Sequence, residues 1–78
     1  MSTVEWKSLG TPPWKWYVDE SLYTMEVYRR IGKTIWEWEL RNEVSQQLLA
    51  YGEHNDVDVA KADIVAAMRE RFKEYECD

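Results

Sequence analysis

Hydrophobic and polar residues alternate along residues 22–28, as they do in a β-strand with one buried face. Met25 and Val27 fall on one side of this pattern, and Glu26 and Tyr28 fall on the other. We therefore expect this segment to form the first strand of a hairpin, with Glu26 and Tyr28 facing solvent.

The alternation resumes after a turn that contains Gly32, and it is strongest in residues 34–41. Glycine suits such a turn because it adopts positive φ angles without a steric penalty. The two tryptophans of this second segment share one side, while Glu37 and Glu39 share the other. The pattern predicts a second strand that buries its indoles and exposes its carboxylates.

Three further stretches complete the predicted sheet region. Residues 47–51 form a short apolar run that ends at Gly52, which predicts a third strand. Residues 14–18 alternate large apolar residues with Lys15, which predicts either a fourth, edge strand or an ordered arm packed on the domain. Residues 1–13 follow neither period and contain a Pro-Pro pair, so we expect an extended N-terminal arm.

Apolar residues recur at spacings of three and four between Val57 and Tyr75, which predicts a C-terminal helix with one apolar stripe. Asp56 or Asp58 is placed to cap its first turn. The predicted fold is α+β: an antiparallel meander of three strands, or four, packed on one C-terminal helix. Residues 14–78 would then form a single domain, with Trp36 and Trp38 turned towards the helix.

Composition indicates a folded protein. The chain has 78 residues, 45% of them hydrophobic and 32% charged, which is typical of a soluble globular domain. It contains neither a run of apolar residues long enough to span a membrane nor a secretory signal, so we expect a cytoplasmic protein, in the host cytoplasm if its source is viral. Because Cys77 is the only cysteine, no internal disulfide can form.

Catalytic motifs are missing from the sequence. One histidine, one terminal cysteine and no glycine-rich phosphate loop leave no evident nucleophile–base pair, so we expect neither enzymatic activity nor a cofactor. The densest group of potential metal ligands is Glu53, His54, Asp56 and Asp58. Its spacing matches no known metal-binding loop, and we interpret it as a helix cap with solvated neighbours rather than a metal site.

The solvent face of the predicted hairpin carries Glu26, Glu37 and Glu39 with Tyr28 nearby. Like charges on adjacent strands are mildly destabilising, so grouping them gives the fold no advantage. Neighbouring arginine and lysine side chains could simply neutralise them. Alternatively, the face docks on a basic groove of a larger protein, where complementary charge would speed the encounter.

Aromatic residues are abundant: five Trp, five Tyr and one Phe. Those near the N-terminus, Trp6, Trp14, Trp16 and Tyr17, exceed what one small core readily encloses. Because Trp and Tyr often anchor protein interfaces, we expect these four residues to form a second part of the partner-binding surface.

The segment from Tyr23 to Phe72 resembles the small YegP-like bacterial domains of unknown function. The likeness rests on a Trp-x-Trp-x-Leu strand, a short aliphatic strand and an alanine-rich helix start, here residues 36–40, 48–50 and 60–62. It implies the same strand–helix order and no activity. The strand order is also similar to that of the plant ethylene-response DNA-binding domain, but the glutamates on the solvent face argue against DNA binding.

These observations lead to one main functional hypothesis and two others. The main hypothesis is a small acidic, non-enzymatic protein-binding module, an inhibitor or regulator, similar in size and charge to phage anti-defence proteins of the anti-CRISPR type. The alternative is a single-stranded nucleic-acid binder that would use exposed aromatic rings with Arg29, Arg30, Lys33 and Arg41. A net charge of −5 disfavours that alternative. Homodimerisation through the first strand or the arm is compatible with either.

Overall fold

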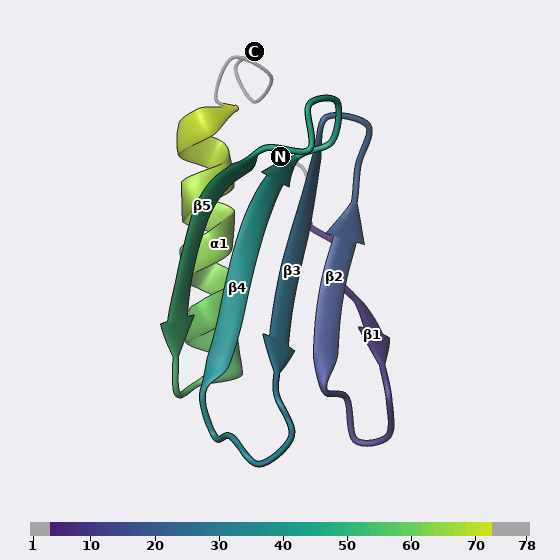
Figure 1. Ribbon diagram of the computed structural model, residues 1–78, viewed down its shortest axis with the longest axis vertical. Coiled ribbons are helices and arrows are strands. Elements are labelled where there is room, and N and C mark those ends of the chain that lie inside the picture. The colour runs from purple at the N-terminus through teal and green to yellow at the C-terminus, as the bar shows by residue number, and fades with distance from the viewer. Residues whose placement is uncertain (1–3, 73–78) are drawn as a thin grey trace.

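The computed structural model describes residues 4–72 and contains five strands and one helix (Figure 1). The elements are β1 (Lys7–Leu9), β2 (Lys15–Asp19), β3 (Tyr23–Arg29), β4 (Trp36–Asn42), β5 (Leu48–His54) and α1 (Val57–Arg71). The strands form one antiparallel sheet in chain order, so each pairs with its sequence neighbours. The expected α+β meander on a C-terminal helix is confirmed, whereas the expected count of three or four strands is too low.

The additional strand comes from the segment that we expected to be an N-terminal arm. Ser8 lies opposite Trp16, and the residues on either side of Ser8 continue this pairing between β1 and β2. As a result β2 is an internal strand rather than an edge, because β3 pairs with its other side. The two edges of the sheet are the short β1 and the longer β5.

Helix α1 covers one face of the sheet, and the other face is left open by the described residues (Figure 1). Trp38 is only 8% exposed and Trp36 is partly buried against the core. The predicted orientation of the indoles is therefore confirmed, and Glu37 and Glu39, which alternate with them along β4, project from the open face. The core brings together Val18, Met25, Val27, Trp38 and Leu40 from the sheet with Ala60, Ile64 and Met68 from the helix.

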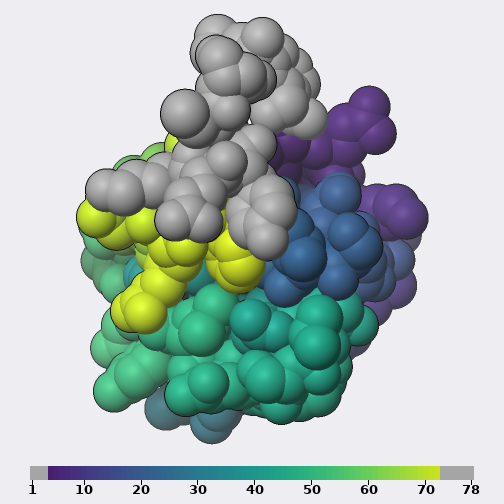
Figure 2. Space-filling model, turned by 90° about the horizontal axis from the view of Figure 1, so that it is seen from above, coloured from purple at the N-terminus to yellow at the C-terminus, as the bar shows by residue number. Residues whose placement is uncertain are grey.

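The helix begins where the sequence predicts. Asp56 is the N-cap, and its carboxylate accepts a hydrogen bond of 2.8 Å from the backbone N–H of Asp58. At the other end the ring of Phe72 packs 5.2 Å from that of Tyr23, centroid to centroid. In Figure 2, which views the molecule from above, the yellow end of α1 lies beside blue atoms of the chain. Tyr75, which the helical pattern included, lies outside the described residues.

Two glycines have different roles in the sheet. Gly32 adopts a φ of 81° in the β3–β4 turn, as its place in the sequence predicts. Gly52 was expected to end the third strand, but β5 continues through it to His54. This expectation was wrong. Gly52 lies directly opposite Trp38, where a side chain would meet the indole, so the glycine makes room for the indole and does not end the strand.

Candidate functional site

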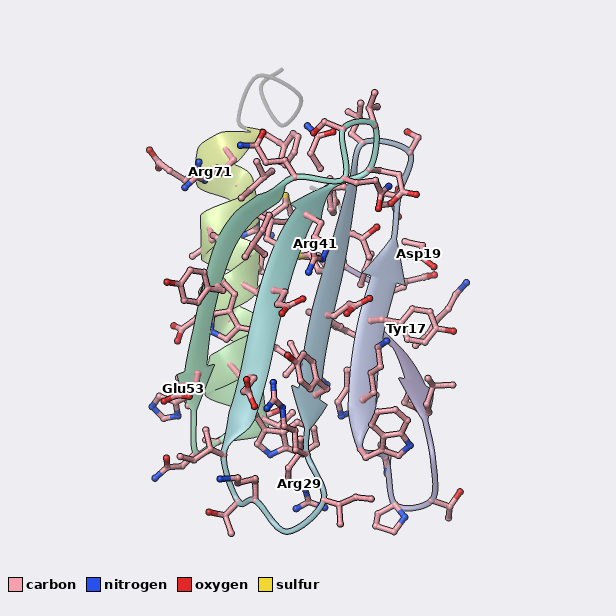
Figure 3. The ribbon with its side chains drawn as sticks, viewed as in Figure 1. Tyr17, Asp19, Arg29, Arg41, Glu53 and Arg71 are labelled. Carbon is pink, nitrogen blue, oxygen red and sulfur yellow. The ribbon has the colours of Figure 1, made fainter. Side chains whose placement is uncertain are left out.

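The open face of the sheet is built from residues that lie opposite one another on adjacent strands and therefore project to the same side. One row across the sheet runs Lys15, Tyr28, Glu37, Glu53. The next row runs Lys7, Tyr17, Glu26, Glu39, Tyr51. In Figure 3 the labelled residues Tyr17, Arg41 and Glu53 mark this face on β2, β4 and β5.

The register places carboxylates in direct opposition at two points. Glu26 lies opposite Glu39 between β3 and β4, and Glu37 lies opposite Glu53 between β4 and β5. Residues in such positions have Cβ atoms about 4.5–5.5 Å apart, so like charges repel one another. The predicted grouping of Glu26, Glu37 and Glu39 is therefore present, and it extends further, to Glu53.

Nearby cations compensate part of this charge. The ion pairs are Lys15 Nζ–Glu26 Oε2 at 3.6 Å, Arg30 Nε–Glu37 Oε2 at 3.0 Å and Arg41 Nη2–Glu39 Oε1 at 3.0 Å. All six side chains are partly exposed, and ion pairs of this kind contribute about 0–1 kcal/mol each. The side chain of Glu53 has neither an ion pair nor a hydrogen bond among residues 4–72.

Tyr28 lies within this cluster, and its hydroxyl donates a hydrogen bond of 3.3 Å to Glu39 Oε2. Burial raises the pKa of Tyr28 above its usual value of 10.0, and a hydrogen bond with Arg30 opposes this rise. The negative charges of Glu39 and Glu37 raise the pKa further, because they disfavour a phenolate beside them. Tyr28 is therefore a neutral donor at physiological pH.

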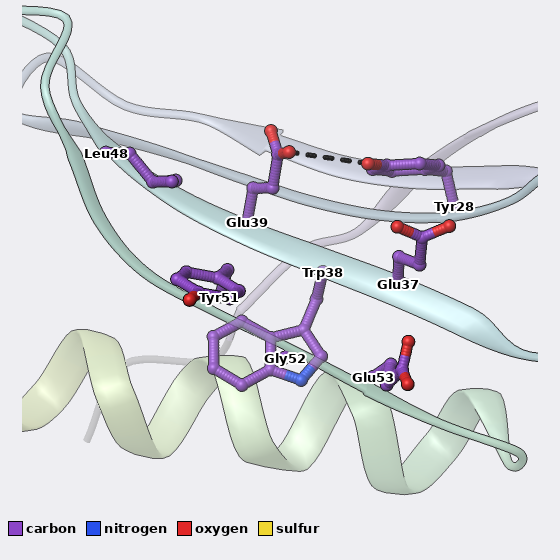
Figure 4. A pocket seen from close by; sticks show the side chains of 8 residues that line it. All are labelled: Tyr28, Glu37, Trp38, Glu39, Leu48, Tyr51, Gly52 and Glu53. Atoms are coloured by element: carbon purple, nitrogen blue, oxygen red, sulfur yellow. Dashed lines mark hydrogen bonds between the residues drawn. The ribbon is translucent and has the colours of Figure 1, made fainter.

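Between β4 and β5 the open face contains a shallow groove of about 480 Å³, which we call the acidic groove (Figure 4). It is lined by Tyr28, Glu37, Trp38, Glu39, Leu48, Tyr51, Gly52 and Glu53. Tyr51 is 74% exposed, so its ring is available to a ligand. Three carboxylates and two phenol rings around one groove form a surface suited to a cationic side chain, through ion pairing and cation–π contacts.

The aromatic residues predicted as a second docking surface lie at different places. Trp6 and Trp16 pack against the core on the helix side, where Lys61 Nζ is 3.5 Å from the ring centroid of Trp16. Burial lowers the pKa of Lys61, and the nearby Asp58 opposes this with a smaller effect. Tyr17 lies on the open face opposite Glu26. The structure thus places only Tyr17 beside the predicted glutamates.

Trp14 is 48% exposed and lies next to a separate, mainly apolar hollow of about 450 Å³. Its remaining walls are formed by Tyr28, Arg29, Arg30 and Ile31, the last of which is fully exposed. This hollow adjoins the acidic groove through Tyr28, which lines both.

Several residues of the candidate metal site and of the candidate nucleic-acid site make local contacts. His54 Nδ1 accepts a hydrogen bond of 3.1 Å from the backbone N–H of Asp56, which caps the helix. Within residues 4–72, no three His, Cys, Asp or Glu side chains are placed so that together they could hold a metal ion. Among the cations proposed for nucleic acid, Arg29 lies over the ring of Trp36, 5.3 Å from its centroid. Arg30 and Arg41 are paired with glutamates.

Comparison of the chain with models of protein families, with curated proteins and with solved structures finds no match. The resemblance to YegP-like domains therefore gains no support from these comparisons. In the part of the chain that the structure describes, no helix has both the length and the apolar character needed to cross a membrane. Any function must be argued from the surface itself.

Sequence reasoning missed the β5 side of the acidic groove. Tyr51 and Glu53 were not recognised because the third strand was expected to stop at Gly52. A signal was present in the sequence: Tyr51 and Glu53 are separated by two positions, so in a continued strand they share a face. This pattern was not recognised because Gly52, which lies between them, was interpreted as the end of the strand.

Proposed function

We propose that the protein is a small, non-enzymatic protein-binding module that docks the open face of its sheet on a basic surface of a larger protein. The observation that carries the proposal is the double opposition of carboxylates, Glu26 with Glu39 and Glu37 with Glu53. Each opposition costs the isolated fold a few tenths of a kcal/mol, up to about 1 kcal/mol. A partner that supplies cations would turn this cost into binding energy.

The aromatic residues on the same face support this proposal. Tyr17, Tyr28 and Tyr51 lie in the two rows that contain the glutamates. Tyrosine offers a large, rigid contact area together with a polar tip, and it is enriched among residues that dominate binding energy. Such a surface would suit an inhibitor or regulator. The likeness to small acidic phage anti-defence proteins rests on size and charge and adds no residue to the site.

Affinity capture from a lysate of the cells in which the protein acts, with three baits, tests the proposal. The baits are the wild type, a face variant with Glu37→Lys and Glu53→Lys, and a control variant with Glu5→Lys and Glu20→Lys. Both variants change the net charge equally, but Glu5 and Glu20 are exposed residues outside the acidic groove. Circular dichroism establishes that both variants are folded.

We expect a basic protein that binds the wild type and the control variant, dissociates at high salt and is lost from the face variant. With the purified partner, the face variant should associate about tenfold more slowly at low salt, because electrostatic steering is reduced. Equal capture by the face and control variants, or no capture specific to the wild type, would show that the open face is an ordinary solvated surface.

A further inference from the structure

The edge of the sheet next to the acidic groove is formed by β5, which has no strand on its outer side in the described part of the chain. β5 has seven residues, and in the described part of the chain β4 is its only strand neighbour. Helix α1 lies behind β5, against the face of the sheet, so it does not cover the outer edge (Figure 1). The backbone groups on that edge are therefore available for another strand.

β5 also lacks most of the features by which proteins protect such edges. Its sequence, Leu-Leu-Ala-Tyr-Gly-Glu-His, contains neither lysine nor proline. One irregularity occurs near its start, where Leu40 pairs with Ala50 but Arg41 pairs with Leu48, so the extra residue is Leu49. Beyond this bulge the pairing with β4 is regular as far as His54.

The opposite edge of the sheet provides an internal comparison. β1 has only three residues, begins with a lysine and is followed within four positions by the Pro12–Pro13 pair. A short edge with a lysine and nearby prolines offers little to an additional strand. The difference between β1 and β5 indicates that only one edge of this sheet is open to extension.

Charge determines what could occupy the β5 edge. Glu53 has no cationic partner among the described residues, and Glu37 and Glu39 lie one strand further into the sheet. A strand beside β5 would project every second side chain over the open face, next to Tyr51 and Glu53. Arginine or lysine at those positions would complement the carboxylates and lie against the tyrosine ring. A second copy of β5 carries no lysine or arginine, so it offers no such complement.

We infer that an extended, basic segment of the partner protein adds to the sheet as a sixth strand along β5, with arginine or lysine side chains entering the acidic groove. This inference rests on the proposed function, because it uses the same glutamates. It adds the mode of binding: main-chain hydrogen bonds along β5 supply affinity, and alternate basic side chains supply specificity.

Three peptides test the inference with the intact protein. The first is a seven-residue peptide of alternating arginine and threonine, acetylated and amidated. The second and third carry N-methyl groups on the amides of all arginines or of all threonines. In an extended chain the N–H groups of the two residue types point to opposite edges, so one control blocks the edge that faces β5 and the other does not.

We expect the unmethylated peptide and one methylated peptide to bind alike, and the other methylated peptide to bind about tenfold more weakly, as the loss of two or more hydrogen bonds predicts. Hydrogen exchange should slow at the outward amides of β5 on binding and not at β1. A peptide with glutamine in place of arginine should not bind at the same concentrations.

Two results would overturn strand addition while leaving the proposed function in place. One is equal binding of all three arginine peptides without protection of β5, which would mean docking by charge alone. The other is a doubled mass of the free protein in light scattering with β5 already protected, which would mean that a second copy occupies the edge. Failure of the unmethylated peptide to bind at low salt also overturns strand addition, and the capture experiment then decides the proposed function separately.

Discussion

The indole of Trp38 occupies the space in which a side chain at Gly52 would lie. A Cβ atom built on Gly52 would be 2.6 Å from Cζ2, 2.7 Å from Cε2 and 2.8 Å from Nε1 of the indole. The two residues face each other directly across β4 and β5. The buried Nε1 of Trp38 has no hydrogen-bond partner in the described chain.

We predict that Gly52→Ala destabilises the protein by about 1–3 kcal/mol, because the added methyl group overpacks the core against the indole. The sign of the effect is informative. Gly52 does not adopt a positive φ, so without the indole the same substitution would stabilise the protein by about 0.4–1 kcal/mol through the unfolded chain. Chemical denaturation monitored by tryptophan fluorescence measures the difference.

Trp38→Phe supplies the control, because phenylalanine lacks the fused benzene ring of the indole, which contains Cζ2, the atom nearest to the added methyl group. The penalty of Gly52→Ala should be clearly smaller in the Trp38→Phe background, which a double-mutant cycle quantifies. An equal penalty in both backgrounds would contradict the proposed packing.

This pair of residues also shows where sequence reasoning succeeds and where it stops. The orientation of Trp38 could be predicted because β4 is long and strictly alternating. The role of Gly52 could not, because a glycine in an apolar run signals a strand end equally well. Only the register between β4 and β5 shows that the glycine makes room for the indole.

The remaining differences between the sequence predictions and the structure also arise from the pairing of strands. Strand β1 has three exposed residues and no hydrophobic alternation, so its pairing with β2, rather than its own pattern, defines it. The ion pairs of the open face likewise depend on register: Lys15 reaches Glu26 from the neighbouring strand, and Arg30 reaches Glu37 across the hairpin. The alternation along the two strands predicted an acidic face that neighbouring cations could neutralise, but strand pairing decides which cations do so.

Asp56 provides a test of the helix start. We predict that Asp56→Ala lowers the free energy of unfolding by about 0.5–2 kcal/mol, because the backbone N–H of Asp58 loses its acceptor. Asp56→Asn should retain most of the stability, since an amide oxygen can accept the same hydrogen bond. Asp63→Ala, an exposed change within the helix, controls for the loss of one negative charge. Equal effects of Asp56→Ala and Asp63→Ala would show that the cap contributes nothing.

Tyr28 should make stability depend on pH in the alkaline range. Its pKa is raised in the folded protein, so the folded state holds the phenolic proton more tightly than the unfolded state. The corresponding stabilisation is present below the unfolded pKa of about 10 and is lost as the pH rises through the folded pKa. Tyr28→Phe should therefore lose less stability than the wild type over this range.

Denaturation at a series of pH values measures the stability, and an NMR titration of the Tyr28 ring measures its pKa in the folded protein. Glu39→Gln serves as a second variant: it removes one of the charges that raise the pKa, so Tyr28 should titrate at lower pH. If Tyr28→Phe and the wild type lose stability in parallel across the alkaline range, the titration of Tyr28 is not the cause of the loss.

Glu53 is a position at which one substitution can test both stability and the proposed binding on the open face. Because it lies directly opposite Glu37, we predict that Glu53→Gln stabilises the free protein by about 0.2–1 kcal/mol at low salt. High salt should reduce this gain, since screening weakens the repulsion in the wild type. Glu20→Gln, at an exposed position outside the sheet, should have little effect under either condition.

The same substitution should weaken binding of the alternating arginine–threonine peptide, because it removes the carboxylate of the acidic groove that has no cationic partner in the described chain. Greater stability and weaker binding in one variant would show that the opposed carboxylates are retained for recognition rather than for folding. Weaker binding without a gain in stability would mean that Glu37 and Glu53 do not repel each other measurably. A gain in stability with unchanged peptide affinity would remove Glu53 from the binding surface.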